Sequence, residues 1–366
     1  MLWSILKPDL VCSVTHRREH QAPKEHPMTF TPVAPQGLLG LRVGDLVEVR
    51  SATEIRATLD ERGELDGLPF MPEMLAFCGR RMTVHKVAHK ACDTISGSGM
   101  RRMRDAVHLS GARCDGSAHG GCETACSIYW KEQWLRRVDP DTAPPPNPEP
   151  DGRVLLPLLE VNARRAPGAD GSVRYSCQGT EMLRATPEHL PARDLRQYSR
   201  DVATGNAGPR AVVTAFLVSL FNLYQQLAKR VLPAALWFRG GLQWRFLAGK
   251  VTSGRTPTAH LDLQPGELVR IKSREEILAT LDQNLLNRGM GFDVEMSRFC
   301  GRIARVKARA NQCIDERTGE MLTMKNPCII LEDIVCEGAF NANCPREFVC
   351  WWREIWLERV PGDSRS

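Results

Sequence analysis

Short runs in which hydrophobic and polar residues alternate recur along this chain. In one of them, Leu46, Val47 and Val49 stand among charged neighbours directly after a Gly-Asp turn. Alternation with a period of two predicts β-strands, because neighbouring side chains of a strand point to opposite faces. The pattern predicts strands at 43–50, 83–87, 106–109 and 130–138.

One short helix interrupts these strands. Ser51 stands at the N-cap position and Glu54 follows three residues later, which is the capping-box pattern at the start of a helix over 54–60. Several short strands around one helical turn are typical of a small antiparallel barrel. The sequence therefore predicts a mainly β fold with an α-helical insert, in which the β part forms two tandem small barrels, SH3-like in style.

The chain contains this pattern twice. Cys78 recurs 222 residues later as Cys300, and Cys92 recurs as Cys313, one residue out of that register. The same offset relates Cys114 to Cys336, Cys122 to Cys344, Trp130 to Trp352 and Trp134 to Trp356. A unit of roughly one hundred residues, the size of a domain, has therefore been duplicated.

The amino-acid composition of the connecting segments predicts how the chain is divided into domains and linkers. We expect a disordered tail at 1–37 (in which Met28 is an alternative start), Cys-rich barrel repeat 1 at 38–139, a Pro-rich linker at 140–152, a helical middle region at 153–248, a linker at 249–261, Cys-rich barrel repeat 2 at 262–361 and a tail at 362–366. Within the middle region, we expect 154–161 to be extended and 190–202 to be helical.

Charge and composition narrow the classes of partner. The formal net charge of +6 permits an anionic partner without requiring one. Aromatic content of 6% is low for a protein that stacks bases on aromatic side chains, so nucleic-acid binding by a small barrel is kept only as an alternative function. The first residues lack the basic flank and cleavage site of a secretory signal, which indicates a reducing cytoplasm.

Thirteen cysteines are the strongest chemical signal in the sequence. Clustered cysteines in a reducing compartment indicate metal ligands, because thiolates bind Zn²⁺ tetrahedrally or hold an iron–sulfur cluster. We expect one such site in each repeat. The predicted ligands are Cys78, Cys114, Cys122 and Cys126 in the first repeat, and Cys300, Cys336, Cys344 and Cys350 in the second.

Some assignments stay open at this point. The register partner of Cys126 is Phe348, so Cys350 is taken as the displaced fourth ligand. Reserve ligands are His119, Cys92, Cys313 and Cys328. Buried free thiols are an alternative for Cys92, Cys313 and Cys177, since cysteine packs well as a small hydrophobic residue. We expect Cys177 to lie apart from the other cysteines.

An uncharged stretch at 211–228, followed by basic residues up to 239, is the one segment suited to a membrane surface. The polar residues Asn222, Gln225 and Gln226 disfavour a bilayer-spanning helix. The pattern favours a helix packed on the repeats, with peripheral contact to the inner membrane through 211–239 as the second interpretation and a true span as the third.

The first repeat carries the signatures Phe-Cys-Gly-Arg, Cys-Asp-Gly-Ser-Ala-His-Gly-Gly-Cys and Tyr-Trp-Lys-Glu-x-Trp-Leu. With these signatures the repeat resembles an uncharacterised family of bacterial Cys-rich proteins. Members tend to be encoded among polysaccharide and specialised-metabolite biosynthesis genes, which implies that other proteins of a biosynthetic pathway are partners. Nucleotide-binding, nucleophile-elbow and zinc-protease motifs are absent from the sequence, so no catalytic residue is assigned. We expect a metal-binding scaffold or accessory protein; an iron–sulfur redox or catalytic protein is the alternative.

Overall fold

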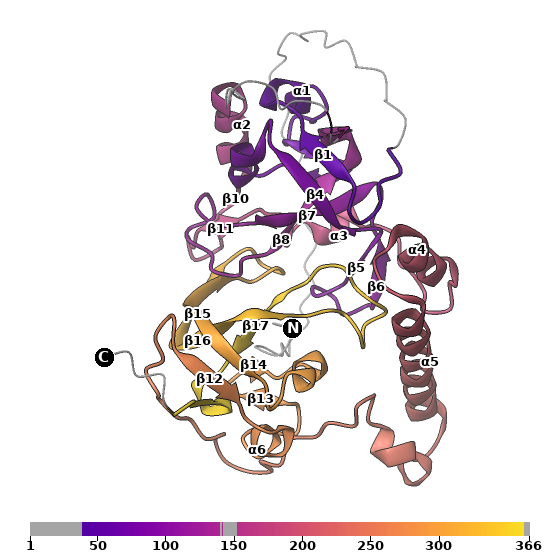
Figure 1. Ribbon diagram of the computed structural model, residues 1–366. Coiled ribbons are helices and arrows are strands. Elements are labelled where there is room, and N and C mark those ends of the chain that lie inside the picture. Colours follow the sequence, from indigo (N-terminus) through magenta and orange to yellow (C-terminus); the bar gives the residue numbers. More distant parts are fainter. Residues whose placement is uncertain (1–38, 140, 142–151, 362–366) are drawn as a thin grey trace.

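The computed structural model describes residues 39–139, 141 and 152–361. The expected tails and nearly all of the Pro-rich linker lie outside the described residues. Within them the predicted mainly β fold with an α-helical insert is confirmed, as two five-stranded sheets lie one above the other and helices flank them (Figure 1).

The first sheet is antiparallel and curls on itself. Its strand order is β8 (Ser127–Lys131), β7 (Ala106–Arg113), β4 (Arg81–Val87), β1 (Leu46–Val49) and β9 (Leu135–Arg137). The two edge strands are separated in sequence by one turn of 3₁₀-helix, η2 (Glu132–Trp134), so the sheet must bend until its edges approach each other. The predicted single strand at 130–138 is therefore wrong, because this turn divides it.

The second sheet has the same strand order. It runs β17 (Val349–Trp352), β16 (Met321–Val335), β15 (Ile303–Ile314), β12 (Leu268–Ile271) and β18 (Leu357–Arg359). Val47 faces Met82 in the first sheet, and Val269 faces Ala304 at the same place in the second. The 222-residue offset of the sequence is thus an offset between equivalent positions in space.

The smaller elements repeat as well. The predicted capping box at Ser51 and Glu54 is confirmed, although its helix is shorter than expected, and Ser273 with Glu276 forms the second copy. The paired elements are α1 (Ala52–Arg56) and α6 (Arg274–Leu278), β2 (Glu64–Leu65) and β13 (Leu286–Asn287), β3 (Leu68–Pro69) and β14 (Met290–Gly291), η1 (Pro72–Phe77) and η6 (Val294–Arg298), and η2 and η7 (Glu354–Trp356). The hairpin of β5 (Lys90–Cys92) and β6 (Met100–Arg102) occurs in the first repeat.

Each core is built around two fully buried tryptophans. The indole Nε1–H of Trp134 donates to Thr58 Oγ1 at 3.1 Å, and that of Trp356 donates to Thr280 Oγ1 at 2.9 Å. The bond ties the closing 3₁₀ turn to the end of the short helix. A buried indole N–H without an acceptor would cost free energy, so the recurring threonine is explained by the tryptophan above it.

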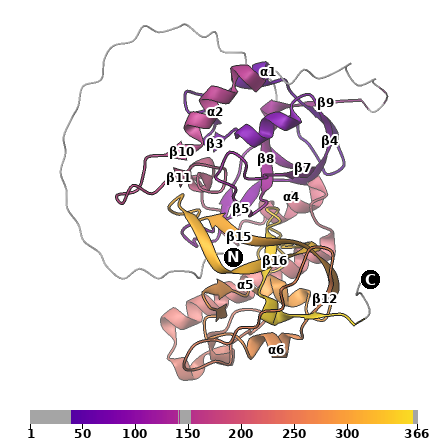
Figure 2. The same cartoon turned by 90° about the vertical axis from the view of Figure 1, so that its left-hand side faces the viewer.

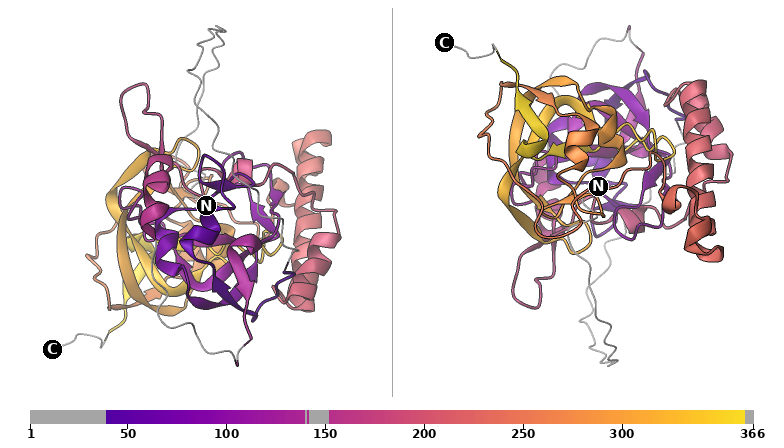
Figure 3. Two further views of the ribbon diagram at one scale, coloured as in Figure 1. Left: turned by 90° about the horizontal axis from the view of Figure 1, so that it is seen from above. Right: turned by 90° about the horizontal axis from the view of Figure 1, so that it is seen from below.

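The middle region lies along both repeats instead of simply joining them. Its elements are η3 (Gly152–Val154), α2 (Leu156–Asn162), β10 (Arg164–Arg165), β11 (Arg174–Tyr175), α3 (Met182–Ala185), α4 (Arg196–Thr204), α5 (Pro209–Val231), η4 (Ala234–Leu236) and η5 (Phe238–Gly241). The extended segment expected at 154–161 is wrong, because α2 occupies it. The helix expected at 190–202 begins later, at Arg196. Viewed from above and from below, α5 stands at the side of the molecule (Figure 3).

Helix α5 buries one face and leaves the other exposed. Its buried residues include Ala215, Val218 and Gln225. Gln225 donates to the carbonyls of Phe238 and Leu242, so its polarity holds the segment after the helix in place. Among the described residues, α5 alone is long and apolar enough to cross a membrane by length and composition, and 28% of its most apolar window is buried.

The two repeats meet through an exchange of loops. The loop 114–126 of the first repeat packs on β15 of the second, where Gln312 donates to the carbonyl of Gly121 at 2.8 Å. The loop 336–348 of the second repeat packs in turn on residues around β5 of the first, where Cys92 N–H donates to Cys344 Sγ at 3.2 Å. Contacts of this reciprocal kind define an isologous, two-fold-like interface. The two sheets face each other across it (Figure 2).

Replacing Trp356 by alanine is expected to lower the free energy of unfolding by about 3–5 kcal/mol, because it opens a large cavity and removes the Thr280 bond. Urea denaturation followed by tryptophan-independent circular dichroism measures the loss. Phe238, which is 51% exposed, provides the control, since Phe238→Ala should change stability little. Equal losses in the two variants would contradict the assignment of the core.

Candidate metal centre

A buried carboxylate organises the first Cys-rich loop. Glu73 lies on η1 and its Oε1 accepts the N–H of Ala118 at 3.1 Å and faces Nδ1 of His119 at 2.6 Å. Cys114 Sγ lies 3.8 Å from the same oxygen. The other carboxylate oxygen, Oε2, is buried and has no hydrogen-bond partner. An unpartnered buried carboxylate oxygen is costly, which marks this corner of the loop as a place where a cation would be stabilised.

Glycine closes the loop tightly. Gly116 has φ +72°, and its carbonyl accepts the N–H groups of His119 and Gly121, both at 2.9 Å. A Cβ atom added at Gly116 would stand 2.1 Å from the Cys122 carbonyl oxygen, so only glycine fits. The turn therefore brings Cys122 back beside the start of the loop.

The second loop repeats this construction. Glu295 accepts the N–H groups of Ala339 and Phe340, each at 3.2 Å. Gly338 has φ +68° and its carbonyl accepts the N–H of Asn343 at 2.9 Å. Glu73 and Glu295 are thus equivalent carboxylates, each holding the loop that carries the cysteines of its own repeat.

Four thiols line one cavity beside the first loop. The cavity lies at the junction of the two repeats, since Ile314, Arg346 and Phe348 of the second repeat also line it. Its sulfur-bearing residues, which we call the first thiol group, are Cys114, Cys122, Cys126 and Cys177. The structure thus brings together three of the predicted ligands of the first repeat. The expectation that Cys177 lies apart from the other cysteines is wrong.

The middle region places Cys177 at this cavity. The neighbouring Gln178 is buried, and its side chain accepts the N–H of Tyr129 at 2.8 Å and donates to the Tyr129 carbonyl at 2.9 Å. It also donates to the carbonyl of Pro69 at 3.0 Å. On the other side, Tyr175 N–H donates to the Gly319 carbonyl of the second repeat at 2.8 Å. The segment is therefore fixed to both repeats.

Burial favours the protonated form of Cys114, Cys126 and Cys177 when no cation is present. Burial, and then the charge of Glu73, raises the pKa of Cys114 far above its usual range. Burial, followed by Glu316, Cys122 and Cys177, raises the pKa of Cys126 well above its ordinary value. Burial also raises the pKa of Cys177 to about 11. Several thiolates cannot coexist here without a positive charge among them, which a metal ion supplies.

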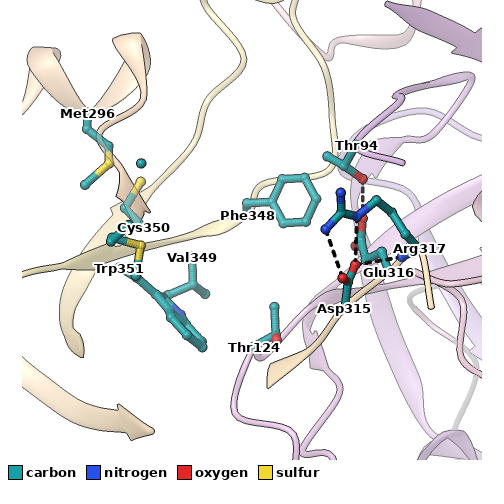
Figure 4. A pocket seen from close by; sticks show the side chains of 12 residues that line it. Thr94, Thr124, Met296, Asp315, Glu316, Arg317, Phe348, Val349, Cys350 and Trp351 are labelled. Carbon is teal, nitrogen blue, oxygen red and sulfur yellow. Dashed lines mark hydrogen bonds and ion pairs between the residues drawn. The ribbon is translucent and has the colours of Figure 1, made fainter. Parts of the chain in front are cut away.

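The second thiol group is arranged differently. It comprises Cys92, Cys336, Cys344 and Cys350, whose charges affect one another's pKa values. Burial opposes ionisation of Cys344, but hydrogen bonds from the Cys92 thiol and the Arg346 backbone hold its pKa below the usual value. Cys350 lies beside Met296 on the far side of a pocket, with Phe348 between it and the ion pair of Asp315 and Arg317 (Figure 4).

The remaining predicted ligands stand elsewhere. Cys78 is in the core of the first repeat and Cys300 packs against that of the second, where burial raises the pKa of each to about 11. Neither is among the residues that line the described cavities. Cys313 is buried on β15, where burial and then the charge of Cys122 raise its pKa to about 12. Cys328 lies on β16, 3.4 Å from the Met324 sulfur.

The reserve ligand His119 belongs to a mixed group. Among the described residues, only Glu73, Cys114 and His119 form a set of three whose ligand atoms lie within 4.8 Å of one another. The second ring nitrogen of His119 lies 3.0 Å from the Ser176 carbonyl oxygen. Both nitrogens thus face oxygen atoms, which orients the ring and fixes the segment that carries Cys177.

Comparison with protein-family models, with curated proteins and with solved structures finds no match to the chain.

We predict that Glu73→Ala opens the first loop and leaves the second closed, because the two carboxylates act separately. The variant should lose about 2–3 kcal/mol of unfolding free energy, as buried N–H groups lose a charged acceptor. Alkylation followed by mass spectrometry should show faster labelling of Cys114 and Cys122, with Cys336 unchanged.

Two variants serve as controls for this experiment. Glu295→Ala should give the reverse pattern, with the cysteines of the second loop labelled faster. Glu61, which is exposed, should be replaceable by alanine without effect on either loop. Labelling that rises in both loops of either carboxylate variant would show that the loops are not held independently.

A buried histidine next to the cavity makes the protein sensitive to acid. Burial lowers the pKa of His108 from its ordinary 6.5 to about 4. The unfolded chain binds a proton there first, so stability is complete above pH 6.5 and falls as the pH drops towards 4. His108→Gln should remove about 2 kcal/mol of the stability difference between about pH 7 and pH 5. If the unfolding free energies of His108→Gln and wild type changed with pH in parallel, the role of His108 would be refuted. The control is His260→Gln, which changes an exposed histidine.

Proposed function

We propose that the protein is a duplicated metal-binding module that acts as a scaffold or accessory protein in a biosynthetic pathway. Its metal is Zn²⁺ or an iron–sulfur cluster, with one thiol-rich centre beside each Cys-rich loop. The observation that carries this proposal is the convergence of Cys114, Cys122, Cys126 and Cys177 on one cavity. Thiolates are ligands typical of either metal centre.

Burial and position support a structural role for the metal. Both groups lie where the loop of one repeat meets the other repeat, so a bound metal would stabilise the interface as well as the loop. Metal binding that requires the folded arrangement adds its binding free energy to the stability of the fold. We further propose that each curled sheet is a small SH3-like barrel, since a 3₁₀ turn joins its two edge strands.

The partners follow from the surface and from the resemblance noted in the sequence. We propose other proteins of a biosynthetic pathway as partners and the cytoplasm as the location. The exposed apolar residues of α5, among them Leu217, Leu220 and Leu227, offer a surface for such a protein or for peripheral contact with the inner membrane. The basic side chains Lys229 and Arg230 at its end suit anionic head groups.

Metal analysis of anaerobically purified protein tests this function. Cys122→Ser should remove the metal of the first centre and lower the melting temperature, whereas Cys344→Ser should remove that of the second. Cys328→Ser is the control for both losses, because it changes a buried thiol outside the two groups. The metal is measured by elemental analysis and the melting temperature by calorimetry.

Each outcome has a defined meaning. Wild-type protein that carries no metal after anaerobic preparation, and takes up none from added Zn²⁺ or Fe²⁺, would reject the function. A Cys122→Ser variant with full metal content and an unchanged melting temperature would remove that residue from the centre. Loss of both metals from either variant would mean that the centres form only together.

A further inference from the structure

We infer that the first thiol group binds an iron–sulfur cluster, with Cys177 as its fourth cysteine ligand. This inference rests on the proposed metal-binding function and assigns the metal of one centre. Its three loop cysteines, Cys114, Cys122 and Cys126, come from the first repeat. The fourth cysteine, Cys177, comes from the middle region, which lies outside the duplicated pattern of cysteines.

The spacing of the sulfurs decides between zinc and a cluster. Four sulfurs about 2.3 Å from a tetrahedral zinc ion lie only about 3.8 Å apart. Among the described residues, no three cysteine sulfurs lie within 4.8 Å of one another. Cys114, Cys122, Cys126 and Cys177 nevertheless border one cavity. This arrangement suits a cluster, because each thiolate of a cluster binds a different iron atom and the four sulfurs need not converge on one point.

The walls of the cavity suit an inorganic cluster. Apolar side chains, including Met71, Ile128 and Phe348, line it between the cysteines. They lower the polarity around the thiols, which would tune the potential of a bound cluster. Four thiolates bring a net negative charge, and the buried guanidinium of Arg346, which is paired with Glu316, lies on the same wall.

Arg346 is held in place by the interface itself. Its two terminal nitrogens donate to the Cys92 carbonyl at 3.1 Å, to Thr94 Oγ1 at 2.9 Å and to Glu316 at 2.8 Å. The positive charge therefore comes from the second repeat, while three of the sulfurs come from the first. A cluster at this point needs both repeats and the middle region, and it cannot be assembled by one repeat alone.

The second thiol group does not share this arrangement. Its members do not line one common cavity in the described structure, since Cys92 and Cys336 border one pocket and Cys350 another. The backbone of Cys92 already contacts Cys344 Sγ. The inference is therefore confined to the first group.

The experiment purifies the full chain anaerobically and measures iron, acid-labile sulfide, zinc and visible absorption. Wild-type protein should be brown and contain iron with sulfide. Cys177→Ser should lose most of the iron and sulfide, whereas the matched Cys78→Ser should keep both, because Cys78 is buried in the core away from the cavity. Circular dichroism of each variant checks that it folds.

A second measurement needs no variant and covers the case in which Cys177→Ser fails to fold. Alkylation of native wild-type protein, read by mass spectrometry, should leave the four thiols of the first group protected together. Removal of iron with an oxidant and a chelator should release them together. Cysteines outside the group, such as Cys300, should not change.

Three results would overturn the inference. Zinc without sulfide in a colourless protein rejects the cluster but leaves metal binding intact. Iron and sulfide that persist in a folded Cys177→Ser variant reject Cys177 as the fourth ligand. Protein that binds neither metal rejects both the inference and the proposed function, so the two failures are distinguishable.

Discussion

One buried carboxylate in each repeat fixes the Cys-rich loop on which the interface depends. A carboxylate far from water is stable only if N–H groups or cations surround it. Glu73 and Glu295 find those N–H groups in the loops themselves, at Ala118 in one case and at Ala339 and Phe340 in the other. The loop must therefore fold back over the carboxylate, and this turns its cysteines towards the opposite repeat.

The duplication explains why cysteines of both repeats meet at the interface. In an isologous contact each surface touches the equivalent surface of its partner, so a residue on one side has a counterpart with the same role. The Cys92 N–H contacts Cys344 Sγ of the second loop, and the charge of Cys122 in the first loop contributes to the raised pKa of Cys313 in the second repeat. The pair that is one residue out of the 222-residue register, Cys92 and Cys313, thus lies at the contact between the repeats.

Local patterns predicted the local structure well. The strands at 83–87 and 106–109 and the capping box of Ser51 follow from neighbouring residues, and the structure contains them. The prediction of one strand at 130–138 is wrong, because the large apolar residues of this segment are also buried where a 3₁₀ turn interrupts it and the sheet curls. At 154–161, apolar residues alone could not distinguish a helix from a strand.

The thiol groups were predictable only in part, for a physical reason. Loop cysteines such as Cys114 and Cys122 are close in sequence, and the tight turn at Gly116 brings them together. The approach of Cys177 depends on the hydrogen bonds of Gln178 to Tyr129, which join segments far apart in the chain. The spacing of the cysteines along the chain does not encode such a long-range contact. A glutamine next to a cysteine is also too common in sequences to predict it.

A duplication within one chain also allows the two halves to differ. In a homodimer every substitution appears on both sides of the two-fold axis, so its two sites stay alike. Here the middle region supplies Cys177 to the first group, and no equivalent segment precedes the first repeat within the described residues. Arg346 contributes a charge from the second repeat, where the first has Thr124 at the matching position. The same fold can therefore place four thiols around one cavity on one side of the interface while the other side keeps the close pair of Cys92 and Cys344.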